Sequence, residues 1–273
     1  MSASEQHLRR LRAVAMTRHK EPVFSHASAA VIHGLPLLHE QLAFIHVLAA
    51  EGVSGRSRNG VIEHERPRAG DVVRRGGFLA TSVGRTVVDL AATRASFVAV
   101  TAADAAIRIQ RFGSQTAQTT KEELFGVWER LLPFRGHTRA RAVIEFANGR
   151  AESPLESISR LSIHQAEFPP PVLQWALSDA DGVIGEVDFA WPELGVVGEA
   201  DGEAKYLDAT LRGGRSAERV VLDEKHREDR IRALGFRVVR WGWREATSPA
   251  LLRARLSAAG LPLPRRAASG LSR

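Results

Sequence analysis

The stretch Val196-Val197-Gly198-Glu199-Ala200-Asp201-Gly202 decides the fold of the C-terminal part of the chain. Its first five residues predict a short buried strand, and Asp201-Gly202 predicts the turn at which that strand ends. Side chains two positions apart in a strand share a face, so Glu199 and Asp201 are expected to point in the same direction. The sequence thus predicts two carboxylates together at the end of a core strand.

Elements on either side of this strand predict an α/β domain with a mixed sheet flanked by helices. They are, in chain order, a helix opened by Ser153-Pro154-Leu155-Glu156, strands over Val172–Leu177 and Val183–Ala190, the strand from Val196, a charged helix over Arg215–Leu234, a strand over Phe236–Trp241 and a helix from Ser248 to about Ala259. This domain is expected over residues 151–260. Residues 261–273 are a basic tail that we expect to be disordered.

Asp188, in the preceding strand, can converge on Glu199 and Asp201 if the two strands are paired neighbours. Three carboxylates that converge at strand ends form an oxygen-ligand site suited to Mg²⁺, with Mn²⁺ as the other candidate ion. Such an ion can generate a nucleophilic hydroxide and neutralise charge on a phosphodiester. The alternative is a surface cluster whose charges are satisfied, in which Asp201-Gly202 is only a turn.

The order of these elements and carboxylates resembles the PD-(D/E)XK, restriction-endonuclease-like superfamily over about residues 151–245. It is most similar to the branch around the very-short-patch-repair endonuclease and to uncharacterised bacterial proteins that carry that domain. The resemblance implies Asp188 as the bridging metal ligand, Glu199 as the second ligand and Glu156 as a helical ligand. Asp201 stands where the superfamily has lysine. Lys205 lies near where those relatives often have histidine, so we expect it to stabilise the attacked phosphate.

The basic side chains of the protein are concentrated in the first half of the chain. Residues 1–150 carry 21 basic and 13 acidic side chains, a net charge of +8, whereas residues 151–273 carry 17 and 18, a net charge of −1. Lysine and arginine contact phosphates in nucleic-acid complexes, so the first half is expected to face DNA. The alternative is that an arginine-rich, alanine-rich sequence reflects the composition of its genome.

Residues 1–150 are predicted to form a smaller, mixed α+β domain. Its segments Ser28–Pro36, Thr81–Leu90 and Ala103–Ala106 resemble the body of the type IV antitoxins of the abortive-infection class, which implies a toxin-like protein as a second partner. Only residues 1–23 precede the first match, so a complete N-terminal winged helix is not expected. We interpret His26 and His33 as capping or packing residues rather than metal ligands, and Arg85 and Asp89 as an ion pair at helical spacing.

Composition excludes several classes of protein. Cysteine is absent, which excludes disulfides, thiol catalysis and cysteine-ligated metal centres. No apolar run reaches the roughly 18 residues that span a bilayer, and the N-terminus lacks the pattern of a signal peptide. A cytoplasmic protein without a membrane partner is therefore expected.

Taken together, the sequence predicts a Mg²⁺-dependent DNA endonuclease that hydrolyses phosphodiester bonds, with Asp188, Glu199, Asp201 and Lys205 as its catalytic residues. The alternative is a non-catalytic, antitoxin-like regulator that binds DNA or protein and retains a decayed nuclease fold. The two hypotheses differ in the surroundings of the carboxylates. Convergence of three carboxylates within about 5 Å favours the enzyme, because a hard cation needs several oxygen ligands at once. Neutralisation of the carboxylates by arginines favours the regulator.

Overall fold

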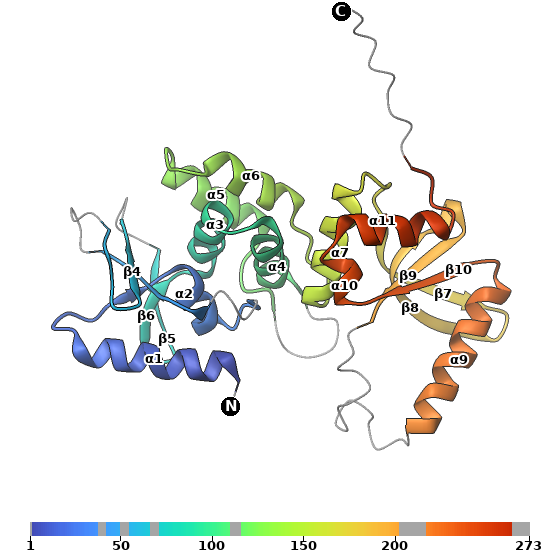
Figure 1. The fold of residues 1–273 in the computed structure, drawn as a ribbon, viewed down its shortest axis with the longest axis horizontal. Helices are drawn as coiled ribbons and strands as arrows, with labels where there is room; N and C mark the ends of the chain where they lie inside the picture. Colours follow the sequence, from blue (N-terminus) through green and yellow to red (C-terminus); the bar gives the residue numbers. More distant parts are fainter. Residues whose placement is uncertain are drawn as a thin grey trace, which may run out of the picture. The chain divides into compact units, whose positions relative to one another are not determined.

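The computed structural model describes residues 2–37, 42–49, 55–65, 71–109, 116–201 and 217–263. The chain divides into two compact units, Met1–Pro154 and Leu155–Arg273, and each combines helices with a mixed sheet (Figure 1). The α/β class is thereby confirmed. The N-terminal unit is mixed α and β, as predicted, but it is the larger of the two because it contains both a sheet and a separate group of packed helices.

The described strands of the N-terminal unit form a six-stranded sheet in the order β3-β4-β2-β1-β6-β5. The elements of this unit are α1 (Ala3–Thr17), β1 (Val23–Phe24), α2 (His26–His33), β2 (Ile45–Leu48), β3 (Ser57–Arg58), β4 (Val61–His64), β5 (Val72–Arg75), β6 (Phe78–Thr81), α3 (Val83–Thr93), α4 (Ser96–Ile107), α5 (Lys121–Leu131) and α6 (His137–Phe146). Helix α3 packs against α4, α5 and α6, so it is the centre of the helical part (Figure 1).

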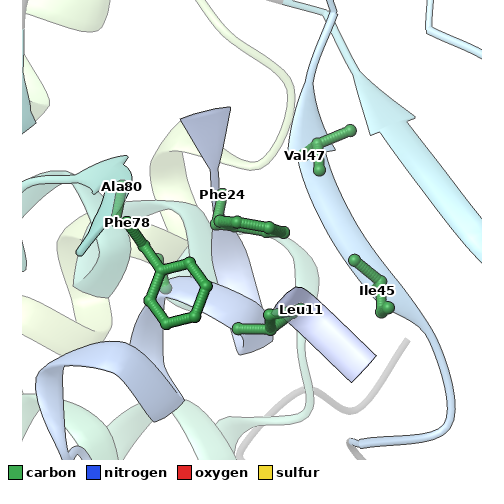
Figure 2. Close-up of a cluster of buried hydrophobic side chains, with 7 residues drawn as sticks. Leu11, Phe24, Ile45, Val47, Phe78 and Ala80 are labelled. Atoms are coloured by element: carbon green, nitrogen blue, oxygen red, sulfur yellow. The ribbon is translucent and has the colours of Figure 1, made fainter. Parts of the chain in front are cut away.

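The core of this sheet is built from alternate residues of its strands. Ile45 and Val47 of β2 pack with Phe24 and Phe78, whose rings meet edge to face with centroids 5.5 Å apart (Figure 2). Leu11 of α1 is fully buried in the same cluster, which fixes the helix against the sheet. Burial of each such large side chain contributes about 1.5–3 kcal/mol, so this cluster is a main source of stability for the unit.

Local signals in the sequence explain the ends of several elements. Thr120 and Glu123 form a capping box at the start of α5, and the Ser82 hydroxyl accepts the Arg85 N–H at the start of α3. The two-residue connection between β3 and β4 is Asn59-Gly60, and both residues have positive φ, at 51° and 75°. This pair is the one that a tight turn between twisted antiparallel strands favours.

The C-terminal unit is organised around a four-stranded sheet in the order β10-β9-β8-β7. Its elements are α7 (Pro154–Gln165), β7 (Val172–Asp179), β8 (Gly182–Trp191), the 3-10 turn η2 (Pro192–Leu194), β9 (Val196–Ala200), α9 (Ala217–Ala233), β10 (Arg237–Trp241), α10 (Trp243–Ala246) and α11 (Pro249–Ala258). Strand β9 has the bounds that the sequence predicts, and all five of its residues are buried. β7, β8 and β9 run antiparallel in turn, whereas β10 is parallel to β9.

Helices α7 and α9 cover opposite faces of this sheet (Figure 1). The Trp241 indole of β10 donates to the Ser159 hydroxyl of α7 at 2.8 Å, so α7 lies on the Trp241 face. Ile231 of α9 packs with Val197 and Val238, and Val238 lies three positions before Trp241. Because odd separations in a strand change the face, α9 lies on the other side.

Some elements were not anticipated from the sequence. Helix α1 has only two buried residues, His7 and Leu11, and so lacks a strong apolar pattern. Ser25 occupies the N-cap position of α2, but its hydroxyl contacts the His26 ring instead of a helix N–H. No described helix is long and apolar enough to cross a membrane. The predicted basic tail lies outside the described residues from position 264 onward.

Candidate functional site

Asp188 and Glu199 lie on neighbouring antiparallel strands. The pairs Phe189↔Gly198 and Ala190↔Val197 fix the register of β8 and β9, and one further step along it places Asp188 opposite Glu199. In the parallel pair β9 and β10, Glu199 is opposite Arg240. Charged residues from three strands therefore lie in one row across the sheet.

The Arg240 guanidinium is surrounded by carboxylates. Its Nη2 lies 3.0 Å from Glu199 Oε2, and its Nη1 lies 2.9 Å from Asp201 Oδ2. Its Nε lies 3.2 Å from Oε2 of Glu228, a residue of α9. One cation thus bridges Glu199 and Asp201, which confirms that these two side chains share a face.

A second arginine reaches the other oxygen of Glu199. Arg227 Nη1 of α9 lies 2.5 Å from Glu199 Oε1, and its Nη2 donates to the Glu186 carbonyl of β8. Only 9% of the Glu199 side chain is exposed, so both of its oxygens are paired inside the protein. Breaking one side of such a buried pair typically costs about 3–5 kcal/mol, because a charge is left without compensation.

The charge of Arg240 is stabilised by its neighbours. Burial disfavours the charged guanidinium, but the carboxylates of Glu199, Asp201 and Glu228 outweigh that effect and raise the pKa of Arg240 above its ordinary value. We name these groups, together with Arg227, the arginine–carboxylate cluster. Its arginines hold the position in which carboxylates would otherwise attract a metal cation.

Asp188 is held by a different set of donors. Its Oδ2 accepts the Ala200 N–H of β9 at 2.8 Å, and its Oδ1 lies 3.4 Å from Gln174 Nε2. The same Gln174 amide donates to Glu156 Oε2 of α7 at 2.8 Å. Glu156 is therefore brought near Asp188, as the resemblance implies, but an amide nitrogen lies between the two carboxylates.

Strand β8 is irregular at Asp188. Phe189 packs on Trp241 on the α7 face, whereas Val187, two residues earlier, joins the cluster around Ile231 of α9. Residues two apart in a regular strand would share a face. Gln174, which lies across the ladder from Asp188, has a φ of 50°. Asp188 is consequently linked through Gln174 to Glu156 of α7, whereas Glu199 pairs with Arg227 of α9 and Arg240 of β10.

A Mg²⁺ ion does not fit the described residues as they are arranged. The oxygens of Glu199 are paired with arginines, and those of Asp188 face N–H donors. Within the described ranges there is no group of three or more His, Cys, Asp or Glu side chains that could hold a metal ion. Lys205, the predicted phosphate-binding cation, lies outside the described residues.

A histidine cluster in the N-terminal unit was not found from the sequence. Arg94 Nη2 lies 2.7 Å from His46 Nε2, and His46 Nδ1 lies 2.8 Å from His64 Nε2. A guanidinium only donates, so His46 accepts through Nε2 and donates through Nδ1 to His64. The His26 ring stacks on His64 with centroids 3.6 Å apart. The three histidines lie on α2, β2 and β4. Because these elements are far apart in the sequence, no local spacing of residues predicts the cluster.

The histidine cluster is neutral near pH 7. Burial, reinforced by Arg94, lowers the pKa of His46 to about 3 and that of His64 to about 4. Burial also lowers the pKa of His26 well below its ordinary value. The His26 ring packs on His64, in agreement with its interpretation from the sequence as a packing residue. The predicted Arg85–Asp89 pair is confirmed, with Nε 2.8 Å from Oδ1.

Three arginines, of which Arg56 and Arg58 are exposed and Arg18 is partly buried, lie together near the end of α1 and the β3–β4 hairpin. Arg18, Arg56 and Arg58 line a cavity of about 350 Å³ there. Arg18 is paired with Glu63 at 2.8 Å, whereas Arg56 and Arg58 lie on the exposed hairpin. We name these three residues the hairpin arginines. Their guanidinium groups are placed where they could contact a bound polyanion.

Two proteins from Mycobacterium tuberculosis are similar to this chain. They are described as the uncharacterized proteins MT2308, from strain CDC 1551 / Oshkosh, and Rv2248, from strain ATCC 25618 / H37Rv. Each is 31% identical over 212 residues, which cover 78% of this chain and 71% of the relative. No family model matches the chain. No solved structure matches it either.

Proposed function

This chain belongs to the same family as these two mycobacterial proteins, and we propose that it is a DNA-binding regulator that does not cleave its ligand. The observation that carries this proposal is the arginine–carboxylate cluster. Arg227 and Arg240 pair with both oxygens of Glu199, and Arg240 also pairs with Asp201. Arginine neutralisation of these carboxylates is the outcome that favours the regulator over the enzyme.

The energetics of the cluster support this interpretation. A divalent ion at Glu199 would have to displace arginines from a carboxylate that is 9% exposed. The displaced guanidinium groups would then lie beside a metal cation, and like charges at short range repel strongly in a partly buried site. The arginines thus replace the ion, and the cluster stabilises the unit without supplying chemistry.

The order of the elements supports a restriction-endonuclease-like fold for the C-terminal unit. Helix α7, strands β7, β8 and β9, helix α9 and strand β10 follow one another in the order on which the resemblance rests. Helices α7 and α9 flank the sheet on its two faces. We propose that this unit retains the fold of the nuclease superfamily while its acidic positions serve structure.

DNA binding is assigned to the N-terminal unit, which holds the basic excess of the chain. The hairpin arginines are its proposed phosphate contacts, since guanidinium groups on an exposed turn can reach a duplex backbone. A toxin-like protein remains a proposed second partner, which rests on the sequence resemblance of this unit alone.

The proposal is tested by DNA binding over a series of salt concentrations, in EDTA and in Mg²⁺. The Arg56→Gln/Arg58→Gln double variant should reduce the salt slope by about one for each phosphate that the removed guanidinium groups neutralise. Arg141→Gln is the matched control, because Arg141 is also exposed but is paired with Glu145 on α6. Mg²⁺ should not raise the affinity, because the proposed binding does not use a metal ion and Mg²⁺ competes with the arginines for phosphates. Equal slopes for the double variant and the control would contradict the assignment of the hairpin arginines.

A Mg²⁺-dependent endonuclease is the second candidate, and one observation favours it. Asp188 lies opposite Glu199 on adjacent strands, with Glu156 joined to Asp188 through Gln174. Titration of the wild type and of Asp188→Asn with Mn²⁺ tests this candidate. A site that binds Mn²⁺ in the wild type and is absent from the variant would favour the enzyme, because the asparagine keeps the size but lacks the charge.

A further inference from the structure

An exposed aromatic side chain lies at the same end of the N-terminal sheet as the β3–β4 turn. Phe44 is 50% exposed. The next residue, Ile45, begins β2, and its N–H donates to the carbonyl of Gly60, in the turn between β3 and β4, at 2.9 Å. Phe44 is therefore one residue away from a backbone contact with the hairpin that carries Arg56 and Arg58.

The backbone that precedes Phe44 is held by helix α1. Arg10 donates through Nη1 to the Leu42 carbonyl at 2.9 Å and through Nη2 to the Ala43 carbonyl at 2.6 Å. The His7 ring lies with Nδ1 3.2 Å from the same Leu42 carbonyl, and since a carbonyl only accepts, Nδ1 donates. Three donors thus hold two consecutive carbonyls, and the Phe44 ring is presented on a fixed backbone.

The position of this ring indicates more than its exposure does. A single exposed apolar side chain is ordinary on a protein surface. A fixed aromatic ring close to exposed arginines is the combination that binds nucleic acid beyond its phosphates, because a base stacks on the ring while guanidinium groups contact the backbone. A ring on a fixed backbone also loses little conformational freedom when a base stacks on it.

The charges at the hairpin suit a backbone beside such a base. Arg56 and Arg58 are exposed, and Glu63, the acidic residue that lines the cavity there, is paired with Arg18 at 2.8 Å. The Glu63 N–H donates to the Arg56 carbonyl at 2.7 Å, which fixes the backbone of the hairpin. A base in a regular duplex has both faces covered by its neighbours, so only a base outside the stack can pack on Phe44.

We propose that Phe44 stacks on an unpaired base of the bound DNA while the hairpin arginines contact the phosphates beside that base. This inference rests on the proposed DNA binding and names the class of DNA that the site prefers, which is a duplex that contains an unpaired nucleotide. A fully paired duplex would use the arginines alone and would bind more weakly.

The test compares three duplexes by fluorescence anisotropy with the full chain, at one salt concentration and in EDTA. The first contains a single bulged adenosine, the second has an abasic nucleotide at the bulge, and the third is fully paired. The two bulged duplexes carry the same number of phosphates, so the ratio of their affinities measures the base alone. The wild type should bind the bulged adenosine roughly fivefold more tightly than the abasic bulge, or more, which is what one stacked base contributes.

Variants locate the stacking ring. Phe44→Leu keeps an apolar side chain but removes the aromatic face, so it should bind the two bulged duplexes equally. Phe44→Trp keeps an aromatic face and should keep the preference. The matched control is Trp243→Leu, because Trp243 is an aromatic residue of the other unit and is 41% exposed, and it should also keep the preference. Circular dichroism of all three variants should match the wild type.

The outcomes separate this inference from the DNA binding on which it rests. Equal affinity of the wild type for the two bulged duplexes would overturn the stacking of Phe44, while the salt slope of the Arg56→Gln/Arg58→Gln variant would still decide the role of the hairpin arginines. A preference for the base that Phe44→Leu retains would also overturn it, because another group would then hold the base. Absence of binding to all three duplexes would overturn both proposals.

Discussion

The two units solve the same physical problem in opposite ways. The C-terminal unit places Glu199 inside the fold and keeps it charged by pairing it with Arg227 and Arg240. The N-terminal unit places His26, His46 and His64 together and keeps them neutral. Burial penalises charge in both places, and the outcome depends on whether an opposite charge is within reach.

A cluster of ionisable residues is therefore not by itself evidence of a metal site. Acidic residues on adjacent strands indicate a metal site only if no arginine reaches them first, and Arg227 and Arg240 reach Glu199 from α9 and β10. Histidines gathered in space indicate a metal site only if their ring nitrogens converge. In the histidine cluster the rings stack, and the nitrogens of His46 and His64 bond to each other. Both clusters are therefore interpreted as structural.

The largest expected difference between the units is their response to acid. In the folded protein the pKa of His46 is about 3 and those of His7 and His64 are about 4, against 6.5 for an ordinary histidine. The unfolded chain therefore binds protons that the folded protein does not. Stability from these histidines is present above pH 6.5 and is lost as the pH falls toward 4. Each contributes up to about 1.4 kcal/mol per pH unit.

Asp89 acts in the opposite direction. Burial raises its pKa from 3.8 to about 6, so the folded protein takes up this proton first as the pH falls from 6 to 4. Proton uptake by Asp89 therefore offsets the loss of stability that about one of these histidines causes as the pH falls. Hydrogen exchange at pH 7.5 and 5.0, corrected for the intrinsic rate, should show protection lost in residues 2–154 before residues 155–263. Equal loss of hydrogen-exchange protection in the two units would contradict the expected difference in their response to acid.

Removal of Arg240 should produce the next largest effect. Arg240→Gln leaves Glu199, Asp201 and Glu228 close together with one fewer cation, and should lower the free energy of unfolding by about 2–4 kcal/mol. The control is Arg232→Gln, since Arg232 is 58% exposed and contacts only the rim of the cluster through Glu228. Urea denaturation of both variants measures the difference. If the two variants were equally stable, the cluster would not stabilise the unit.

The elements of the C-terminal unit were largely predictable, because their signals are local. Strand β9 covers Val196–Ala200, as predicted, and the β7–β8 hairpin turns at Ala180-Asp181, just before Gly182. Helix α1 could not be predicted in the same way. It presents mostly polar residues, and apart from the buried Leu11 the apolar side chains that it packs on the core, Leu8, Val14 and Ala15, are only partly buried.

The surroundings of the candidate site were less predictable than its strands. The sequence indicated that Glu199 and Asp201 share a face, since period two is a property of every strand. It could not indicate that Arg227 and Arg240 would reach them, because these residues come from a later helix and strand. Nor could it indicate the irregularity at Asp188, which lies across the ladder from the positive φ of Gln174 in β7.

The smallest expected effect is the loss of stability when a glycine on the α7 face of β9 is substituted. A side chain at Gly198 would overlap the Trp241 ring on the α7 face, while its neighbour Glu199 faces the arginines. Gly198→Ala should destabilise the protein by about 1–3 kcal/mol through overpacking. Gly84→Ala, where the nearest atom is a Val127 methyl at 3.2 Å, should cost less. Thermal unfolding compares the two, and the reverse order would contradict this packing of β9.

We propose that arginines occupy the acidic site and that the protein binds DNA without cutting it. The most direct test is a nicking assay of the wild type with plasmid, mismatched and single-stranded DNA in Mg²⁺ and in Mn²⁺, beside DNA binding in EDTA. The wild type is expected to bind DNA and to cleave none of these substrates. Metal-dependent cleavage by the wild type that disappears in Asp188→Asn would contradict it and establish the endonuclease instead.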